Sequence, residues 1–511
     1  MSGRRCLPSF RSGRYPRSVW HPQGVLGILP PVEVRVRPFT GVRMRVPSLV
    51  SCRSIGWFAS LLLVLIAPQL ASADTPWKAG VSKRVITPET SVWLAGYGSK
   101  RAPDGKLHDL WMKALALESA TGERAVLITS DFQGVPKIMS DPVFARLKTE
   151  FGLERRQVMF TFSHNHCGPR LGDDLIDYYP VEAEQEELVA AYTRVMIDRT
   201  VELVADALRQ LAPAELHTSQ GRATFAVNRR NNREADVPQL LEQGTPLVGP
   251  VDHTVPVIRV TGSGGEVIAI VFGYACHPTT LSFMTWCGDY PGFAQLLIEQ
   301  KYPSALAMFV NTCGGDQNPL PRRKVELCEK YGQQLAAGVF QALDSPQAPV
   351  SGGLKTSFSL IDLPYLQVVT RAELEKEVRE NNGIKARWGA RLLKKLDAGE
   401  QFESAYPYPL HAWRLGNELL MIGMGAETVV DYALKFKQQY GPVTWVCGYA
   451  DDMISYIPSR RVWEEGGYEG GFNLFEYGRP ALRWAGDIED RISAGVERLV
   501  REVGGAPVVR P

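Results

Sequence analysis

Two histidines spaced as H-x-H directly follow an apolar run in the first half of the chain. His164 and His166 come after residues 158–162 (VMFTF), whose composition is typical of a buried strand. In extended backbone, residues i and i+2 point to the same side, so both imidazoles can face one metal ion. Zinc accepts neutral imidazole nitrogens, and a catalytic zinc typically has about three protein ligands and a water. Two surface histidines are the simpler alternative, and this pair alone does not exclude it.

Three further polar residues also lie close to the ends of strand-like segments. His277 ends a second apolar run in the sequence ACHPTT, Glu427 lies in GAET between a strand and a helix, and Tyr456 lies in the loop that follows the strand at 443–447. Proteins with α/β folds commonly assemble their sites where strands end, which favours a shared site. Each residue also has a simpler interpretation: a structural histidine, an acid in the first turn of a helix, or an ordinary loop aromatic.

Segments typical of strands and helices alternate along the chain. They predict an α/β fold with mixed β-sheets flanked by helices, in a single large catalytic domain with the metal site at the C-terminal ends of strands. The expected strands cover 125–130, 158–162, 305–310 and 443–447, with hairpins at 255–275 and 411–423. The expected helices cover 186–211, 293–300, 324–343, 428–438 and 488–503, with a long charged surface helix at 371–398.

The first 73 residues differ in composition from the rest. They contain ten arginines and one acid, Glu33, and an apolar run at 57–67 leads to Ala71-Ser72-Ala73. A basic flank, a short apolar stretch and an A-x-A-like site predict a secretory signal peptide, with the mature chain beginning near Asp74. An uncleaved membrane anchor is the alternative, although the run is short for a span. We interpret residues 1–43 as upstream sequence translated in error and residues 44–73 as the signal peptide.

The chain after residue 73 is acidic. It retains 47 of the 57 basic and 54 of the 55 acidic residues, so its net charge is −7 rather than +2. A basic binding surface is therefore not indicated, and nucleic acid is not an expected partner. An even number of cysteines permits disulfides in an exported protein, and Cys313 with Cys328 is one candidate pair. The six cysteines of this part are Cys167, Cys276, Cys287, Cys313, Cys328 and Cys447.

The order of these motifs resembles the neutral/alkaline non-lysosomal ceramidase family. H-x-H-x-G-P at His164 is followed by C-H-P-T at His277, by GDYPGFA at 288–294, by a loop ending in Gly315-Asp316, and by G-A-E-T at Glu427. The segments 79–97, 227–229 and 456–470 also match the family pattern. The resemblance runs from about Ala79 to Gly470, and it implies an enzyme of the zinc-dependent amidohydrolase type.

By this resemblance the chain binds one Zn²⁺ through five side chains: His164, His166, His277, Glu427 and Tyr456. Met453 occupies a place where the family often has another tyrosine, which makes Tyr456 the better ligand candidate. A water bound to zinc would attack the amide carbonyl, because the metal lowers the pKa of the water and polarises the carbonyl.

The resemblance also suggests groups around the metal. Arg229 and the Tyr456 hydroxyl are the candidates for stabilising the developing oxyanion, and a surface ion pair is the alternative role for Arg229. Asp131 follows the strand at 125–130. It either orients a ligand histidine or has a helix-capping or solvent-facing role.

Two features depart from the family pattern. The loop that usually reads G-D-x-S-P-N has Asn318 in place of the serine. An amide side chain forms hydrogen bonds but is not a nucleophile, so Asn318 would orient substrate while the metal-water route carries the reaction. The C-terminal β-domain typical of longer ceramidases is also not expected, so we interpret residues 74–511 as the ceramidase-like zinc amidohydrolase domain alone.

The leading hypothesis is a secreted or periplasmic zinc-dependent hydrolase that cleaves the N-acyl amide bond of ceramide or a related substrate. Its partners would be a lipid or small-molecule amide and, transiently, a membrane surface. One alternative applies the same site to an ester or a non-lipid amide. Another is a secreted, metal-containing binding protein without turnover, for which Asn318 is the best support.

Overall fold

The computed structural model describes residues 77–508, so the expected signal peptide and the first 43 residues lie outside the described residues. Strands β1 to β19 and helices α1 to α11 follow one another along this part of the chain. Within it, no helix is both long and apolar enough to cross a membrane.

A large mixed sheet forms the first half of the fold. Its strands lie in the order β11-β9-β8-β6-β1-β3-β4-β5, with β13 paired to β6, and only the β4–β5 and β9–β11 pairs are parallel. In chain order the strands are β1 (Trp77–Val85), β3 (Trp111–Ser119), β4 (Arg124–Ser130), β5 (Val158–Phe162), β6 (Ala212–Arg222), β8 (Thr254–Gly262), β9 (Val267–Tyr274), β11 (Leu306–Asn311) and β13 (Ala348–Pro349).

A second sheet of four strands packs face to face on the first. It has the order β14 (Leu354–Pro364), β15 (Ala405–Leu415), β16 (Leu419–Met424) and β18 (Trp445–Cys447). Leu115 and Leu117 of β3 belong to the apolar core that also contains Trp413 and Trp445 of this sheet. Ala114 and Ala116, which alternate with these leucines, face the other core, because side chains alternate along a strand.

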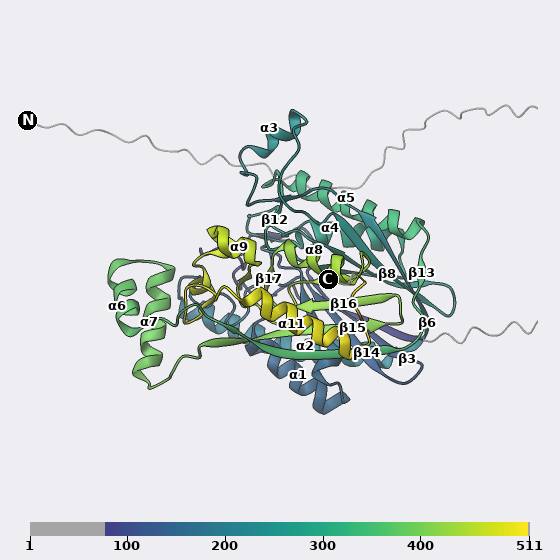
Figure 1. Cartoon of the computed structure of the whole chain (residues 1–511), viewed down its shortest axis with the longest axis horizontal. Coiled ribbons are helices and arrows are strands. Elements are labelled where there is room, and N and C mark those ends of the chain that lie inside the picture. The colour runs from purple at the N-terminus through teal and green to yellow at the C-terminus, as the bar shows by residue number, and fades with distance from the viewer. Residues whose placement is uncertain (1–76, 509–511) are drawn as a thin grey trace, which may run out of the picture. The chain divides into compact units, whose positions relative to one another are not determined.

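Helices cover the outer face of each sheet (Figure 1). The nine-stranded sheet packs against α2 (Ala183–Arg209), α4 (Asp289–Lys301) and α5 (Val325–Asp344), with α1 (Lys137–Phe151) beside α2. The four-stranded sheet packs against α8 (Val430–Tyr440) and α11 (Ile488–Glu502). Four layers result, helix on sheet on sheet on helix, and the predicted α/β class with mixed sheets is confirmed.

The expected long helix at 371–398 is wrong, because the chain breaks there into two helices. Helix α6 (Arg371–Glu380) ends before Gly383, and α7 (Ile384–Asp397) begins after it. Gly383 has a φ of 80°, which is incompatible with a continuous helix. The pair is not solvated on all sides, since Leu374, Trp388 and Leu392 form a small core of their own.

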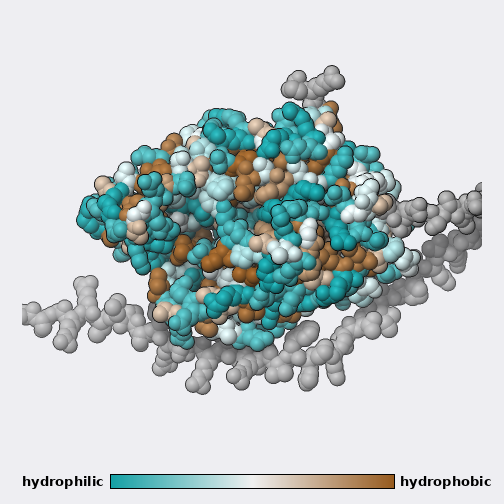
Figure 2. Space-filling view, turned by 90° about the horizontal axis from the view of Figure 1, so that it is seen from below, coloured by the Kyte–Doolittle hydropathy of each residue, from teal (hydrophilic) through white to brown (hydrophobic). Residues whose placement is uncertain are grey.

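Short elements complete the fold and tie loops together. They are β2 (Gly105–Lys106), β7 (Ala226–Asn228), α3 (Val237–Glu242), β10 (Thr285–Trp286), β12 (Gln317–Pro319), β17 (Glu427–Thr428), β19 (Tyr456–Ile457), α9 (Arg460–Glu465) and α10 (Gly467–Gly470), with single 3₁₀ turns at 155–157 and 474–477. The surface of the described part is mainly hydrophilic, with smaller hydrophobic groups on the face shown in Figure 2.

The main sheet curls, and this brings the ends of distant strands together. Strand β11 at one edge also contacts β4 and β5 at the opposite edge. The Asn311 side chain at the end of β11 donates a hydrogen bond to the Ser163 carbonyl just after β5, at 2.9 Å. Such curling follows from the twist that accumulates from strand to strand. As a result the loops after β5, β9 and β16 meet.

Candidate metal centre

Three buried side chains from three different loops converge on one point. The ligand atoms of His164, His277 and Glu427 all lie within 4.8 Å of one another. The Oε2 atom of Glu427 lies 2.8 Å from Nε2 of His277 and 3.2 Å from Nε2 of His164. The Nε2 atom of His166 lies 3.1 Å from that of His164, so this imidazole points at the same place. The predicted histidines and glutamate therefore lie together.

The backbone brings the H-x-H pair together by a different route from the one expected. His164 has a φ of 65°, in the left-handed region, so the loop turns here instead of continuing the strand. The Asn165 side chain accepts a hydrogen bond from the Cys167 amide at 2.8 Å and stabilises this turn. The expectation of an extended segment is thus wrong, although the two imidazoles do converge.

The hydrogen bonds of the histidines fix which nitrogen faces the cluster. Nδ1 of His164 lies 2.8 Å from the Gln133 carbonyl, and Nδ1 of His277 lies 2.7 Å from the Gly314 carbonyl. Because a carbonyl oxygen only accepts, both Nδ1 atoms carry the proton. The Nε2 atom of each ring is thereby turned toward the Glu427 carboxylate.

The electrostatics of the cluster favour a bound cation. Burial lowers the pKa of His277 to about 4 and lowers that of His166 well below its usual value, so both rings are neutral near pH 7. Burial would raise the pKa of Glu427, but positive charge and hydrogen-bond donation at the His164 and His277 positions hold it well below its ordinary value. With His277 neutral, a bound cation would supply that charge. Neutral nitrogens and an anionic oxygen, all acceptors, are the donor set that a divalent metal uses.

Asp131 does not orient a histidine of the cluster. Its carboxylate accepts hydrogen bonds from the Trp111 amide at 2.8 Å and from the Gln295 side chain at 3.5 Å. It is also buried, so the solvent-facing alternative does not hold either. Backbone carbonyls of Gln133 and Gly314 take the orienting role that the sequence assigned to this carboxylate.

Arg229, Asn318 and Tyr456 form a second group beside the cluster. The Arg229 Nη2 donates to the Tyr456 hydroxyl at 3.0 Å, and its Nη1 donates to the Asn318 side-chain oxygen at 3.2 Å. The Tyr456 oxygen lies 3.3 Å from Nε2 of His277, which joins the two groups. Burial raises the pKa of Tyr456 well above its usual value, so the phenol keeps its proton.

Arg229 is ion-paired, but it is not a surface residue. Its Nε lies 2.7 Å from Oε1 of Glu469, and its side chain is only 18% exposed. Burial would lower the pKa of Arg229, but Tyr456 and Glu469 outweigh this and raise it well above the usual value. A permanent positive charge therefore stands within hydrogen-bond distance of Tyr456.

Two residues of the site were not among the sequence candidates. Tyr477 donates a 2.6 Å hydrogen bond to Oε1 of Glu427, which leaves Oε2 for the histidines. Glu469 holds Arg229, as described above. Glu469 lies in the closing segment 456–470 that matched the family pattern, so a signal existed for it. Tyr477 lies 50 positions from Glu427, and no spacing rule connects them.

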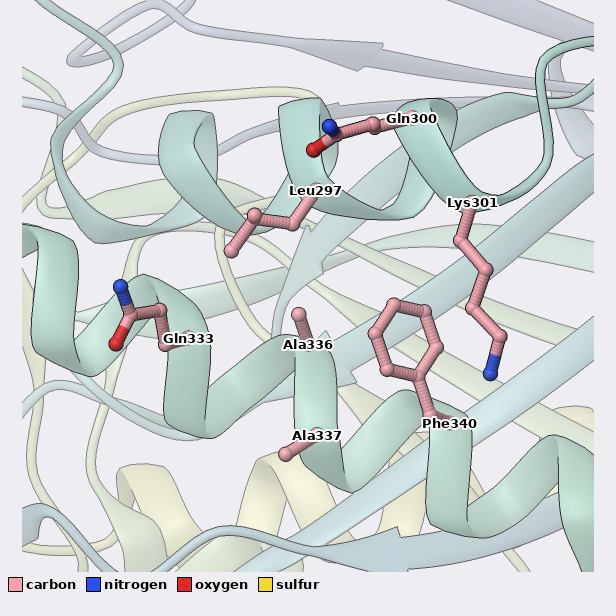
Figure 3. Close-up of a pocket in the computed structure, with 7 residues that line it drawn as sticks. All are labelled: Leu297, Gln300, Lys301, Gln333, Ala336, Ala337 and Phe340. Atoms are coloured by element: carbon pink, nitrogen blue, oxygen red, sulfur yellow. The ribbon is translucent and has the colours of Figure 1, made fainter. Parts of the chain in front are cut away.

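A separate cavity of about 420 Å³ lies between α4 and α5 and is shown in Figure 3. Leu297, Ala336 and Phe340 line it together with amide side chains and Lys301. Its described lining contains no histidine, cysteine or carboxylate, so it offers no metal ligands. The convergent cluster, and not this cavity, is the candidate centre.

Fold and site together define the class: a mixed α/β protein whose loops hold a buried histidine–carboxylate group suited to a metal ion. Residues 77–320 match the family model described as neutral/alkaline non-lysosomal ceramidase, N-terminal. The resemblance drawn from the motifs is confirmed, and residues 77–320 belong to the neutral/alkaline non-lysosomal ceramidase family.

Individual relatives extend the match over most of the chain. The neutral ceramidase of Pseudomonas aeruginosa is 22% identical over 490 residues, which cover 81% of this chain and 71% of the relative. The neutral ceramidase of Mycobacterium tuberculosis is 21% identical over 467 residues, covering 75% and 71%. The crystal structure of neutral ceramidase from P. aeruginosa superposes with a TM-score of 0.65 at 19% identity, over 85% of this chain and 76% of that one. This last likeness supports the fold.

The donor set predicts what removal of a ligand does. Changing His277 to Ala or Glu427 to Gln should remove most of the bound metal from the purified protein, because the remaining acceptors no longer balance a cation. Metal content per chain, measured by elemental analysis, checks this. His217→Gln on β6 is the matched control, since that histidine lies outside the cluster, and it should retain the metal. Full metal content in either cluster variant would show that the assigned ligands are wrong.

Proposed function

We propose that the protein is a zinc-dependent hydrolase that cleaves the N-acyl amide bond of ceramide or a related N-acylated substrate. One observation carries the proposal. The Tyr456 hydroxyl, a hydrogen-bond donor, lies 3.3 Å from Nε2 of His277, in the cluster of histidines and Glu427. Metal-assisted amide hydrolysis uses both: a place for a cation and water, and a donor for the oxyanion that develops. Membership of a ceramidase family supports the choice of bond.

Zinc suits the residues present. Two or three imidazole nitrogens and one carboxylate oxygen are a frequent zinc donor set, and the metal would be held by His164, His277 and Glu427, with His166 and Tyr456 beside them. When bound, zinc lowers the pKa of a coordinated water and polarises the substrate carbonyl. The carbonyls of Gln133 and Gly314 keep the two ligand rings in the tautomer that binds metal.

Tyr456 and Arg229 have distinct roles in this proposal. The Arg229 guanidinium donates to Tyr456, Asn318 and the Gly315 carbonyl, so its nearby donors are already engaged. The Tyr456 hydroxyl accepts from Arg229 and still has its own proton to donate. Tyr456 would therefore donate to the oxyanion, and the Arg229 charge would strengthen that hydrogen bond.

Asn318 acts through Arg229 in this arrangement. Its side-chain oxygen accepts from Nη1, and strand β12 pairs with β7 so that Asn318 lies opposite Val227, two residues from Arg229. Such a residue positions a cation and requires no nucleophilic atom. This supports attack by water and is consistent with the absence of the family serine at this position.

Apolar surface near the site supports a lipid substrate. The Tyr468 ring lies 5.1 Å from that of Tyr456, and its residue is 48% exposed, so it connects the buried hydroxyl with solvent. A large exposed aromatic side chain beside a catalytic group favours an amphiphilic substrate presented at a lipid surface. An ester or a non-lipid amide at the same site is the alternative substrate class.

A metal-containing binding protein without turnover is the second candidate function, and Asn318 is the observation that favours it. Purified protein should hydrolyse N-acylsphingosine in a panel that also includes a fatty-acid ester and a non-lipid amide. A chelator should abolish that activity and zinc should restore it. Hydrolysis of the ester or the non-lipid amide alone would select the other substrate class. Zinc bound at full occupancy without hydrolysis of any panel member would select the binding protein.

The two residues around Tyr456 predict a graded mutational response. Arg229→Ala should lower kcat/KM by about 10²–10³-fold, the usual cost of weakening an oxyanion donor. Asn318→Ala removes one hydrogen bond, worth about 0.5–1.5 kcal/mol, and should cost up to roughly tenfold.

Both variants should keep their metal, because neither residue is a ligand. Arg233→Ala, a change at an 84% exposed side chain, is the control and should leave the rate unchanged. A collapse of many thousandfold in Asn318→Ala with metal still bound would contradict the positioning role.

We also propose that the protein is exported, as a secreted or periplasmic enzyme. The support is the basic, apolar and A-x-A-like sequence of residues 44–73. N-terminal sequencing of exported material should find a start near Asp74. A mature chain beginning before Ser60 would contradict the predicted cleavage.

A further inference from the structure

One oxygen of the Glu427 carboxylate is held by a tyrosine from outside the metal-binding loops. The Tyr477 hydroxyl donates a 2.6 Å hydrogen bond to Oε1, while Oε2 lies 2.8 Å from Nε2 of His277 and 3.2 Å from Nε2 of His164. The Tyr477 side chain is buried, and its ring packs edge-on against Tyr456 at 6.2 Å between centroids. The two carboxylate oxygens therefore have different partners, and the oxygen that faces the histidines is Oε2.

The hydrogen bond to Oε1 restricts how Glu427 can bind a metal ion. A carboxylate with two free oxygens can ligate a metal through both of them, and it then takes two positions on the ion. The Tyr477 phenol engages Oε1, so Glu427 offers Oε2 alone. A catalytic zinc keeps an open position for water or substrate beside about three protein ligands, and ligation through one oxygen preserves that position.

Helix α7 holds the turn that carries Tyr477. This residue is the last of a 3₁₀ turn, and the backbone directly after it accepts two hydrogen bonds from α7. The Arg391 Nη2 donates to the Gly478 carbonyl at 2.8 Å, and the Trp388 indole donates to the Arg479 carbonyl at 2.8 Å. Both bonds fix the chain next to the phenol.

The Arg391 guanidinium is itself firmly held. Its Nε lies 2.8 Å from Oδ1 of Asp177 and its Nη2 lies 2.7 Å from Oδ2, a bidentate pair in which the carboxylate is buried. Bidentate charged pairs are among the stronger side-chain contacts in proteins. Gly478 has a φ of 71°, and a Cβ there would lie 2.9 Å from Nη2 of Arg391, so a glycine lets the guanidinium approach the turn this closely.

Apolar packing adds to these hydrogen bonds. Helices α6 and α7 lie side by side at one end of the described fold (Figure 1). Phe475, in the turn of Tyr477, packs against the small core that the two helices share, and its ring lies 6.1 Å from that of Trp388. The helix pair is therefore connected to the Glu427 carboxylate through one short turn and one phenol.

We infer that Tyr477 is a positioning residue that limits Glu427 to a single metal-ligating oxygen, and that helix α7 holds Tyr477 in place through Arg391. The inference rests on the proposed function, because it concerns a ligand of the proposed zinc. Without the phenol the carboxylate is free to rotate, so it is less firmly aimed at the cation and Oε1 can also ligate it. The loss of such a supporting hydrogen bond typically costs about 10–100-fold in metal affinity.

The first test changes Tyr477 to Phe, which keeps the ring and removes only the hydroxyl. The zinc affinity of the full chain, measured by competition with a chromogenic chelator, should fall about 10–100-fold. The Co²⁺-loaded variant should absorb visible light more weakly than Co²⁺-loaded wild type, because ligation by Oε1 raises the coordination number. An unchanged zinc affinity would overturn the positioning role, and an unchanged Co²⁺ spectrum would overturn the limit to one oxygen.

Tyr408→Phe is the matched control. The Tyr408 hydroxyl donates a 2.8 Å hydrogen bond to the Gly425 carbonyl, two residues before Glu427, so the same loop loses the same kind of bond without a change at the carboxylate. This variant should keep the wild-type zinc affinity and Co²⁺ spectrum. An equal loss in Tyr408→Phe would trace the effect to the stability of the loop and would contradict the role of Tyr477.

A second set of variants tests helix α7. Arg391→Ala removes the bond to the Gly478 carbonyl and should also weaken zinc binding. In the double variant with Tyr477→Phe the two losses should not add, since both act through the same hydroxyl. Arg387→Ala is the control on the same helix, because its guanidinium donates to backbone carbonyls of the loop at 177–178 instead, and it should keep the wild-type affinity. No loss in Arg391→Ala, or fully additive losses, would overturn the part assigned to α7.

The wild-type measurement separates this inference from the proposed function. Wild-type protein that bound no zinc would overturn the proposed metal centre, and the inference with it. Wild-type protein that bound zinc no more tightly than Tyr477→Phe would overturn the inference alone.

Discussion

The rest of the site depends on one electrostatic constraint, the close approach of hydrogen-bond acceptors that have no proton between them. Nε2 of His277 and Nε2 of His164 lie 2.8 and 3.2 Å from the Glu427 carboxylate, and all three side chains are buried. Without a cation such a group is unfavourable, since a buried charge needs a partner. The surrounding chain holds it by strained backbone, because His164, Ala426 and Tyr449 all have positive φ without being glycine.

The four-layer fold supplies the rigidity that this arrangement requires. The core between the sheets includes Trp413 and Trp445, and it anchors β16 and β18, which lead into the loops of Glu427 and Tyr456. Close backbone approach then joins the two halves of the site. A Cβ on Gly315 would lie 2.7 Å from the Glu427 carbonyl, so only glycine lets the loop of Asp316 and Asn318 reach this distance. The packed sheets thus stabilise a local geometry that would not persist alone.

The sequence predicted the elements better than the connections between them. Strands such as 158–162 and the hairpin at 255–275 were predictable because period-two patterns and turn glycines are local signals. The prediction of a single helix over 371–398 was wrong. The charged, helix-like pattern on both sides of Gly383 concealed the break that this glycine makes with its φ of 80°. The residues of the site came from a family pattern. The groups that orient the histidines could not be predicted in this way. They are backbone carbonyls such as that of Gln133, which any residue type provides.

Two short ladders link the halves of the proposed chemistry. Glu427 lies opposite Tyr456 in the β17–β19 pair, so the carboxylate of the candidate metal centre and the phenol proposed to face the oxyanion move as one unit. Arg229 follows β7, and Asn318 lies in its partner β12, so the charge that strengthens the phenol rests on a separate ladder. Hydrogen bonds from Arg229 to Tyr456 and Gly315 join the ladders. A change that shifts the β7–β12 ladder therefore displaces the Arg229 charge from the phenol, even when Glu427 and Tyr456 keep their positions.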